Sequence, residues 1–344
     1  MVPYAPRIGD TESEFVLRES GRRLSLSQGG QEDMRPLLDT KIVVVTGAGG
    51  FIGPSVVEAM LRHGAIVRAL VGPPGETVRK IPEGVLTAFC DITDATIVRE
   101  LVEGSDVVVH LAGPASVNES FENATEYARV HVCGTATVLD ACREEGVRRL
   151  VYISSAEVYA RSETQLVREH QRLEARSPYG AAKIGAEKLV EAFVLNTGIQ
   201  AAILRPFSIY GPGLSRQSVL GTILHQAQRN DCIQLRDLKP IRDYCYLDDL
   251  ARAIVLSCVA NLDSRCVINI GTGIGTSVGE LAQLVLKVRG LNLPVRECNQ
   301  GGGPATAEIF RLVADRRLAR KVLGWSSQTP LALGIQRTVE LSAA

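Results

Sequence analysis

A tyrosine and a lysine four residues apart, Tyr179 and Lys183, are the first residues in this sequence whose types and spacing could do chemistry. Ser177 is a good N-cap and Pro178 a good first helical residue, so both side chains are expected on one face of a helix, one turn apart. An ammonium group beside a phenol stabilises the phenolate and lowers the pKa of the tyrosine. The pair therefore predicts a general acid and base centred on Tyr179.

Two serines stand where a hydroxyl could assist that tyrosine. Ser154 and Ser155 follow a predicted strand at 150–153, and a strand end is a place from which a side chain reaches a neighbouring helix. Such a hydroxyl would hold the reacting oxygen of a substrate. The expected chemistry is proton transfer to and from a substrate hydroxyl or carbonyl.

A glycine-rich turn near the start of the regular sequence indicates a cofactor for that chemistry. The turn reads TGAGGFIG at 46–53, directly after a predicted strand. Its first glycine permits the tight turn, its second lets backbone N–H groups approach a pyrophosphate, and its third allows close packing of helix on strand. The N-terminus of the next helix faces the anion. The turn thus predicts a dinucleotide site at Gly47, Gly50, Phe51, Ile52 and Gly53.

The end of the second predicted strand leaves the choice between NAD and NADP open. An acid there would bind the adenosine ribose hydroxyls of NAD, but residues 70–75 read LVGPPG and contain none. An arginine for a 2′-phosphate is also missing at this place, although Arg79 and Lys80 follow some residues later. NAD is the expected cofactor, with NADP not excluded.

Predicted strands and helices alternate through the first two thirds of the chain. Strands are expected at 42–45, 66–71, 85–90, 107–111, 150–153 and 201–204, and helices at 51–63, 119–145 and 178–196. This alternation predicts an α/β fold with a Rossmann-type, doubly wound parallel sheet. Ligands of such sheets bind at the carboxyl ends of the strands.

The pattern changes at both ends of this region. Residues 1–40 are polar and without a sustained period, which predicts an N-terminal arm or flexible extension. Residues 41–205 form the expected NAD(P)-binding domain. After residue 205 glycine and proline increase, and helical patterns at 247–260, 278–288 and 315–323 predict a small C-terminal substrate-binding lobe. Residues 206–344 are expected to make up mainly this lobe, with segments that return to the sheet.

Composition excludes several classes of partner. The chain has 344 residues, 38 of them basic and 38 acidic, so its formal net charge of +0 favours neither nucleic acid nor an anionic membrane as partner. No stretch approaches the ~20 apolar residues of a membrane span. The eight cysteines show no metal-ligand spacing, which predicts packing thiols and no metal site. A signal-peptide pattern is also missing, so a reduced, cytoplasmic protein is expected.

Taken together, these features resemble an extended short-chain dehydrogenase/reductase of the NAD-dependent nucleotide-sugar epimerase/dehydratase family. The resemblance runs from about residue 41 to residue 338. Beyond the glycine turn and the Tyr-x-x-x-Lys pair it rests on these motifs: DITD at 91–94, HLAG at 110–113, GT at 134–135, RPFSIYGP at 205–212, RDYCYLDDL at 242–250, NIGTG at 269–273 and KVLGW at 321–325.

The resemblance implies roles for individual residues. Asp91 and Ile92 would hold the adenine, while Leu111 and Ala112 would line the ribose and nicotinamide. Tyr179 and Lys183 would contact the nicotinamide ribose. The residues expected to flank the nicotinamide are Pro206, Phe207 and Ser208. Ser155 is the expected catalytic hydroxyl, because it precedes Ala156 as the serine of the family precedes an alanine.

The two residues after that serine bear on the outcome of the reaction. The resemblance implies hydride transfer from a sugar C4 to the cofactor, which gives a 4-keto intermediate. Dehydratases of the family place an aspartate and then a glutamate after the serine or threonine, whereas this chain has Ala156 and Glu157. Ala156 favours a nucleotide-sugar 4-epimerase. Glu157 keeps open a decarboxylase or dehydratase that uses this carboxylate, unless it is an exposed carboxylate at a strand end.

Two further alternatives remain at this point. An NADPH-dependent 4-keto-sugar reductase would suit the second strand, which lacks the acid. A cofactor-sensing binding protein would use the same fold without catalysis, since fold alone does not decide function. The intact Ser155, Tyr179 and Lys183 argue against such a sensor, because a sensor needs no acid or base.

Several positions depart from the family pattern in the expected substrate region. His131 stands where the family has an asparagine before V-x-G-T, and an interior histidine with satisfied hydrogen bonds is expected there. The arginine that commonly precedes the late proline is replaced by glycine at 303, and Arg242 or Arg311 would take its place on the nucleotide diphosphate. The expected substrate-binding residues are Ser155, Glu157, Ser208, Arg242 and Arg311. The resemblance also implies a homodimer that packs the helices at 119–145 and 178–196 across a twofold axis.

Overall fold

The computed structural model describes residues 36–75, 78–161, 164–229, 231–263, 265–298 and 309–342. The predicted arm up to residue 35 and the glycine-rich stretch at 301–304 lie outside these residues. Among residues 36–40, the end of the predicted arm, Leu38 is buried and the other four are exposed. Leu38 is fully buried, and its N–H donates to the carbonyl of His63 at 2.9 Å. The prediction of an extension is therefore wrong for these last residues, because the apolar Leu38 completes the core under the first helix.

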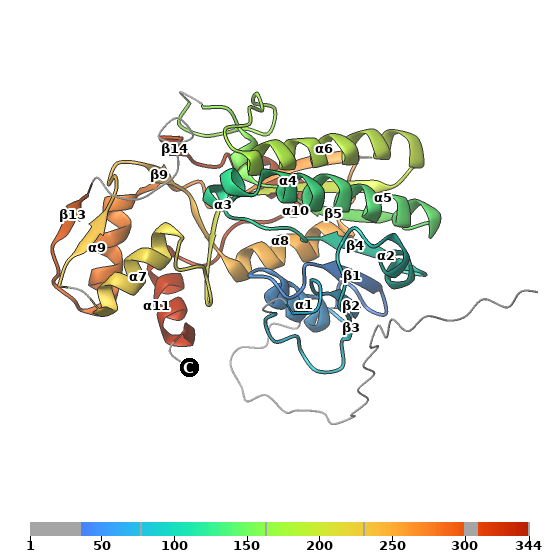
Figure 1. Ribbon diagram of the computed structural model, residues 1–344, viewed down its shortest axis with the longest axis horizontal. Coiled ribbons are helices and arrows are strands. Elements are labelled where there is room, and N and C mark those ends of the chain that lie inside the picture. The colour runs from blue at the N-terminus through green and yellow to red at the C-terminus, as the bar shows by residue number, and fades with distance from the viewer. Residues whose placement is uncertain are drawn as a thin grey trace, which may run out of the picture.

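A seven-stranded parallel sheet forms the centre of the molecule (Figure 1). In spatial order its strands are β11 (Arg265–Ile270), β6 (Gln200–Pro206), β5 (Arg149–Ile153), β4 (Val107–His110), β1 (Ile42–Thr46), β2 (Ile66–Leu70) and β3 (Leu86–Ala88). The sheet is buried on both faces: Val43 and Val45 of β1 enter one core and Val44 the other. The predicted Rossmann-type fold is confirmed. The six predicted strands are all present, and β11 is a seventh that was not predicted.

Helices cover both faces of this sheet (Figure 1). One face carries α1 (Gly53–Arg62), α8 (Leu247–Val259) and α10 (Arg317–Leu323). The other face carries α2 (Ala95–Val102), α5 (Gly134–Glu144) and α6 (Pro178–Thr197). The chain beyond residue 205 thus contributes β11 to the sheet, and α8 and α10 to the helices that cover it. The exact boundary at residue 205 stays a prediction.

The single long helix predicted at 119–145 is wrong in detail. The chain forms α3 (Val117–Glu122), α4 (Ala124–Ala128), a π-helical turn at Arg129–Cys133 and then α5. The break lies at Asn123, whose φ of −127° and ψ of 40° leave the helical region. π-Helical turns occur most often at functional sites, and this one contains His131.

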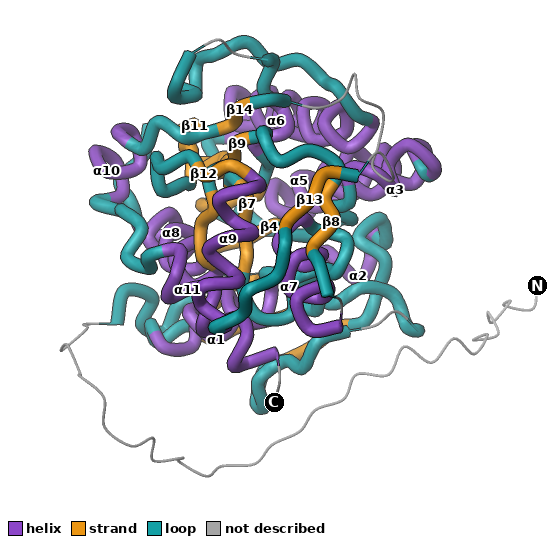
Figure 2. The backbone as a smooth tube through the Cα atoms, turned by 90° about the vertical axis from the view of Figure 1, so that its left-hand side faces the viewer, coloured by secondary structure: helices purple, strands orange, loops and turns teal. Residues whose placement is uncertain are grey.

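The remaining elements form the lobe at the carboxyl side of the sheet, as Figure 2 shows end-on. Its helices are α7 (Val219–Arg229), α9 (Val278–Arg289) and α11 (Leu331–Ser342). Its short strands pair as β7 (Ser208–Tyr210) with β10 (Tyr244–Tyr246), as β12 (Thr276–Ser277), β9 (Ile241–Arg242) and β14 (Arg311–Leu312) side by side, and as β13 (Val295–Glu297) with β8 (Ile233–Leu235). The small lobe expected from the sequence is present, with its own apolar core.

The cysteines differ in how deeply they are buried. Of the cysteines, Cys90, Cys142, Cys245 and Cys258 are buried, and Cys133 is exposed. The prediction of packing thiols therefore fails for Cys133, whose place on the outer surface was hidden by its apolar neighbours in sequence.

None of the helices within the described ranges has the combined length and apolar character that spanning a membrane requires.

Candidate active site

The glycine turn joins the ends of β1 and β4. Gly47 has a φ of +68°, and a Cβ there would lie 2.7 Å from both the Cα and the backbone N of Ala112. A Cβ on Gly53 would overlap the carbonyl of Ala48. The N–H groups of Leu111 and Ala112 donate to the carbonyl and the hydroxyl of Thr46. Glycine alone fits at positions 47 and 53, which keeps the turn against the segment after β4, and its role as a pyrophosphate site stays a prediction.

A loop after β2 packs against this cradle. The N–H of Arg79 donates to the carbonyl of Gly49 at 3.0 Å, and its guanidinium lies 5.8 Å from the ring centre of Phe51. The same guanidinium donates to the carbonyl of Gly213 in the lobe. Arg79 thus joins the cofactor turn to the lobe, while Lys80 is exposed.

The predicted adenine residues lie beyond β3. Ile92 is buried against Gly134, whereas the carboxylate of Asp91 accepts hydrogen bonds from Thr93 and forms an ion pair of 2.8 Å with Arg129. The hydrogen bond from Arg129 lowers the pKa of Asp91 to about 2. Arg129 was missed by the sequence analysis, because its partner is 38 residues away. The contact of Asp91 with adenine stays a prediction.

The predicted acid and base, Tyr179 and Lys183, lie together next to the carboxyl end of β5. The hydroxyl of Ser177 caps α6 by accepting from the N–H of Gly180 at 3.0 Å. Tyr179 and Lys183 are buried on one face of that helix, and the side chain of Ser155 is near enough to the Tyr179 hydroxyl to lower its pKa. The Nζ of Lys183 donates to the carbonyl of Ile153 at 2.7 Å. Ser155, Tyr179 and Lys183 are therefore brought together as predicted.

Burial dominates the electrostatics of this pair. It raises the pKa of Tyr179 to about 12, and the Ser155 hydrogen bond offsets that rise only in part. Burial also lowers the pKa of Lys183 to about 7. The expectation that Lys183 lowers the pKa of Tyr179 is therefore wrong. The reason is that desolvation of both groups exceeds their mutual attraction, and that the ammonium is engaged with Ile153.

Glu157 lies on the substrate side of Ser155. It belongs to a 3₁₀ turn at Ala156–Val158, where its N–H donates to the hydroxyl of Ser155 at 3.2 Å. Burial raises the pKa of the Glu157 carboxyl, and the positive charge of Arg242 counteracts that rise. An exposed carboxylate at a strand end is thus excluded.

The other predicted substrate and cofactor residues occupy neighbouring strands. Phe207 is buried at the end of β6, and Ser208 opens β7, where its N–H donates to the carbonyl of Asp243 at 2.9 Å. Arg242 on β9 and Arg311 on β14 lie on paired strands. The Nε of Arg311 donates to the carbonyl of Gln165 at 3.1 Å. Arg311 is thus engaged with the loop after β5, whereas Arg242 donates to the carbonyl of Ile241 at 3.1 Å.

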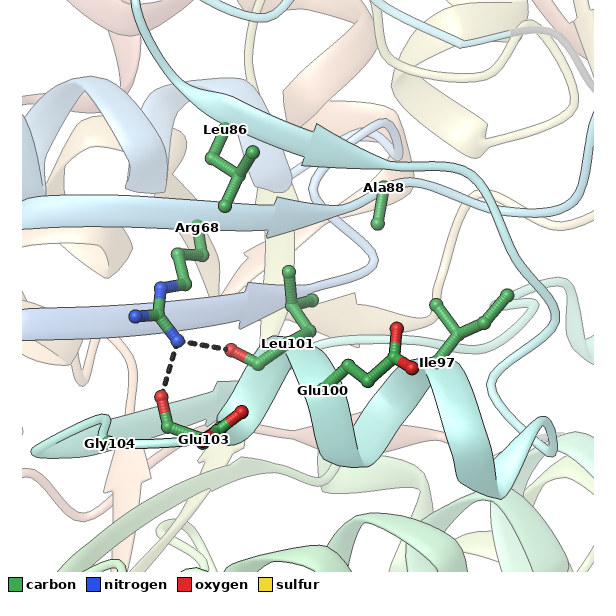
Figure 3. Close-up of a pocket in the computed structure, with 8 residues that line it drawn as sticks. All are labelled: Arg68, Leu86, Ala88, Ile97, Glu100, Leu101, Glu103 and Gly104. Atoms are coloured by element: carbon green, nitrogen blue, oxygen red, sulfur yellow. Dashed lines mark hydrogen bonds between the residues drawn. The ribbon is translucent and has the colours of Figure 1, made fainter. Parts of the chain in front are cut away.

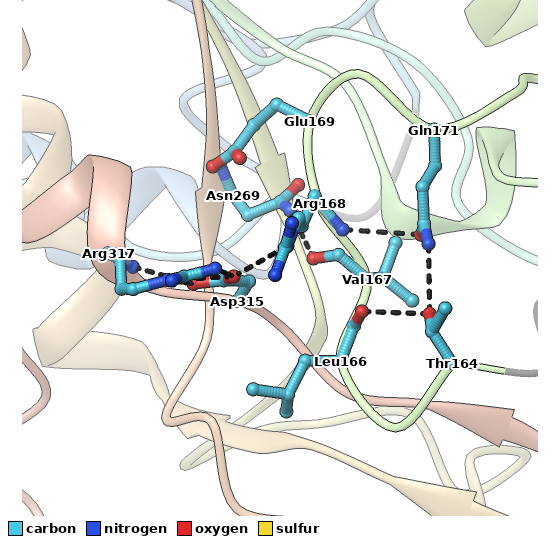
Figure 4. Close-up of polar contacts among 9 residues, drawn as sticks. All are labelled: Thr164, Leu166, Val167, Arg168, Glu169, Gln171, Asn269, Asp315 and Arg317. Atoms are coloured by element: carbon cyan, nitrogen blue, oxygen red, sulfur yellow. Dashed lines mark hydrogen bonds and ion pairs between the residues drawn. The ribbon is translucent and has the colours of Figure 1, made fainter.

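That loop, from 164 to 171, is held against the lobe (Figure 4). The side-chain amide of Asn269 donates to the carbonyl of Val167 at 2.9 Å, and Arg168 forms an ion pair of 3.3 Å with Asp315. Asp315 also pairs with Arg317 at the start of α10. These contacts fix the segment between Ser155 and Tyr179, the two groups that must act on one substrate atom.

A buried ion pair lies next to these residues, and the sequence did not predict it. Arg205 on β6 and Glu187 on α6 are both almost fully buried, with 2.6 Å between Nη2 and Oε2. Glu187 also accepts a hydrogen bond from Ser154, and Arg205 donates to the hydroxyl of Tyr159 at 2.9 Å. Ser154 is therefore committed to this pair, which leaves Ser155 as the serine available to a substrate.

The depression shown in Figure 3 lies away from these residues, between β2, β3 and α2. Within it Arg68 donates to the carbonyls of Leu101 and Glu103. Its lining contains no residue of the Ser155, Tyr179 and Lys183 group, so it is not a candidate for the acid and base chemistry.

Comparison with known proteins places this geometry in a family. The sequence pattern of the "NAD dependent epimerase/dehydratase family" matches residues 43–271. The chain belongs to this family. It is 30% identical to a UDP-glucose 4-epimerase of Mycolicibacterium smegmatis, with 86% of this chain and 97% of the relative covered. It is 28% identical to a dTDP-D-glucose 4,6-dehydratase of Mus musculus, with 87% and 88% covered.

A solved structure agrees with these relatives. MoeE5 in complex with UDP-glucose and NAD superposes with a TM-score of 0.79 at 29% identity, covering 88% of this chain and 98% of that chain. The family assignment confirms the expectation of an NAD-dependent enzyme of the epimerase/dehydratase type. It also confirms the resemblance on which the site residues were selected, whose individual roles stay predictions.

Proposed function

We propose that this protein is a nucleotide-sugar 4-epimerase that acts through a transient 4-keto intermediate with bound NAD. The observation that carries the proposal is the placement of Tyr179 and Lys183 on one buried face of α6, next to Ser155 at the end of β5, with the apolar Ala156 next in the chain. NAD supplies an acceptor that takes the hydride from C4 and gives it back, together with a positive charge that favours the phenolate of Tyr179. Relatives named as UDP-glucose 4-epimerases support a UDP-sugar as substrate.

The residues divide the work of proton transfer and orientation. Tyr179 takes the proton of the C4 hydroxyl as the hydride leaves C4, and returns it when the hydride comes back to the other face of the ketone. Ser155 donates to the C4 oxygen and holds it beside the phenol. Lys183 keeps its bond to the carbonyl of Ile153 and would hold the nicotinamide ribose. The net change is inversion at C4, with no oxidant or reductant consumed.

Ala156 argues for epimerisation over loss of water. Elimination of the C6 hydroxyl needs an acid to protonate the leaving oxygen, and a methyl side chain offers no proton. Ala156 is buried beside Ser155 and offers no proton donor at this position. A 4-keto sugar formed here therefore lacks the help it needs to lose water.

Glu157 and Arg242 give a second candidate. A 4-keto uronic acid loses CO2 readily, and a carboxyl with a raised pKa beside an arginine could assist that step or hold the C6 carboxylate. We place this decarboxylase second. Arg242, together with Arg311 on the adjacent strand, is also proposed to bind the nucleotide diphosphate, and that role explains the presence of Arg242 equally well. Ser208, at the start of β7, would contact the sugar.

The test uses the purified full chain. The protein is denatured and the released dinucleotide is identified by mass, and native protein is then incubated with a panel of UDP-hexoses and UDP-uronic acids without added cofactor. We expect released NAD and formation of the C4 epimer of one hexose. Release of CO2 from a uronic acid would instead support the second candidate. Turnover only after addition of NADPH would contradict both and favour a reductase.

A further inference from the structure

His131 is a buried histidine in direct contact with the proposed acid and base. It lies in the π-helical turn at Arg129–Cys133 and is 1% exposed. Its ring centre is 5.6 Å from that of Tyr179 at an interplanar angle of 64°, and 5.9 Å from that of Tyr127. A side chain packed on the ring of Tyr179 is well placed to affect where that ring lies.

The two nitrogens of this ring have different surroundings. Nε2 lies 2.8 Å from the carbonyl oxygen of Pro114, and because a carbonyl only accepts, Nε2 carries the proton. Nδ1 is fully buried and has no hydrogen-bond partner among the described residues. The prediction of an interior histidine with satisfied hydrogen bonds is therefore wrong for one of its nitrogens. A buried acceptor that lacks a donor is costly, so a donor from outside the chain is expected there.

The charge state of the ring follows from its neighbours. The groups that face it are Lys183 and Tyr179 from α6, Tyr127 from α4 and His110 from β4. Burial and the charge of Lys183 lower the pKa of His131 to about 2. The imidazole is thus neutral at any working pH, and Nδ1 keeps its lone pair as a permanent acceptor.

Gly113 packs against the edge of the His131 ring that carries Nδ1. Gly113 has a φ of +133°, and a Cβ there would lie 2.5 Å from the Nδ1 of His131. Only glycine leaves room for the ring at this place. Gly113 directly follows Leu111 and Ala112, which the family resemblance assigns to the ribose and nicotinamide. The unpaired nitrogen therefore borders the segment where the cofactor is expected.

We propose that the Nδ1 of His131 accepts a hydrogen bond from a hydroxyl group in the loaded site, and that His131 is by this means a positioning residue for Tyr179. The donor is an O–H group, which is either an ordered water or a ribose hydroxyl of the dinucleotide. The proposal rests on the hydride-transfer site around Tyr179 and Lys183, but not on which sugar is turned over.

Two substitutions of His131 test the roles of its two ring nitrogens separately. In His131→Gln the side-chain amide nitrogen can occupy the place of Nε2 and keep the bond to Pro114, but no acceptor remains at the place of Nδ1. In His131→Asn the amide oxygen can occupy the place of Nδ1, while the bond to Pro114 is lost. Thermal unfolding, kcat, KM and the amount of dinucleotide retained after gel filtration are measured for both variants and the unchanged protein.

We expect His131→Gln to keep its melting temperature and lose about tenfold in kcat or in retained dinucleotide. His131→Asn is expected to melt a few degrees lower, by roughly 2–4 °C, and to keep both functional values. A fall in retained dinucleotide identifies a ribose hydroxyl as the donor, whereas a fall in kcat at full retention identifies a water. The proposal would be overturned if kcat and retained dinucleotide fell together with the melting temperature in both variants. It would also be overturned if His131→Gln showed no functional change.

The dinucleotide readout keeps this test apart from the proposed function. If no UDP-sugar is epimerised but His131→Gln alone loses its dinucleotide, the epimerase proposal fails and the role of His131 stands. If epimerisation is found and both variants behave as the unchanged protein does, the epimerase proposal stands and the role of His131 fails.

Discussion

Tyr179 and Lys183 are buried in a place where both lose most of their hydration. In the cofactor-free protein the pKa of Tyr179 rises to about 12 while that of Lys183 falls to about 7. Both shifts favour the neutral form, which is the direction that desolvation always imposes.

Replacing Tyr179 by phenylalanine tests its role as acid and base. The phenyl ring keeps the edge contacts to Tyr127 and His131, so the melting temperature should hold. Removal of the hydroxyl should lower kcat by about 10²–10⁴-fold. Steady-state kinetics and released dinucleotide are measured together. Unchanged behaviour towards every ligand, with the dinucleotide still bound, would favour a cofactor-sensing protein over an enzyme.

Lys183 predicts a pH dependence of stability. Its pKa is lowered from 10.5 to about 7 on folding, so the unfolded chain binds more protons between these values and stability rises with pH across that window. The penalty is fully present below pH ~7. In Lys183→Met this rise should be absent. Cofactor-free protein and variant are melted at about pH 6.5 and about pH 9.5. An equal change in both proteins would contradict the lowered pKa.

Sequence reasoning at this scale found groups that are close together along the chain. Ser177, Tyr179 and Lys183 share one helix, so their arrangement follows from spacing alone. It missed Arg129 and Glu187, because their partners come from other strands and helices. The pKa directions were missed for the same reason, since burial is a property of the assembled site.

Among the elements, the glycine turn ties the cofactor site to the sheet most tightly. Gly47 and Gly104 have nearly equal φ values of +68° and +64°, but a Cβ meets the backbone of Ala112 in the first case and nothing within 4 Å in the second. Gly104→Ala should cost only the backbone strain of about 1 kcal/mol. Gly47→Ala should cost clearly more and also abolish dinucleotide retention. Equal stability losses with NAD still bound would contradict the close packing at Ala112.

Periodic elements were predictable and irregular ones were not. The predicted strands have valine-rich runs and fall within the parallel sheet, whereas β11 begins with a charged residue in a region without clear alternation. The π-helical turn arises inside a continuous helical pattern, which has no local signal for the extra residue. The site residue that this turn presents, His131, was therefore judged from its type alone.

For the molecule as a whole, a few buried charges connect the lobe to the sheet. Asp243 accepts hydrogen bonds from Thr272, Gly273 and Ala314, which come from the segments after β11 and β14. The carboxylate of Asp249 accepts from Gln328 and Thr329 ahead of α11. These bonds join the segment between β9 and β10 to the chain after β11 and β14, and α8 to the segment ahead of α11.

The helices on the α6 side lead to a prediction about assembly. Ala181, Ala192 and Leu195 are exposed along α6, and we propose that a second copy packs on this face and on the neighbouring α4 and α5. Ala192→Arg should convert a dimer to a monomer, because it places a charge in a contact of small residues. Glu100→Arg, on the exposed side of α2, is the control. Light scattering that finds monomers in the unchanged protein would rule out the dimer.

The most direct test of the account follows the hydrogen at C4. The enzyme is incubated, without added cofactor, with a UDP-hexose that carries deuterium at C4, and the product is analysed by NMR. We predict that the deuterium is found at C4 of the epimer, since the hydride leaves and returns at the same carbon. Deuterium at C6, its loss to the cofactor, or the absence of any C4 epimer would contradict the proposed function.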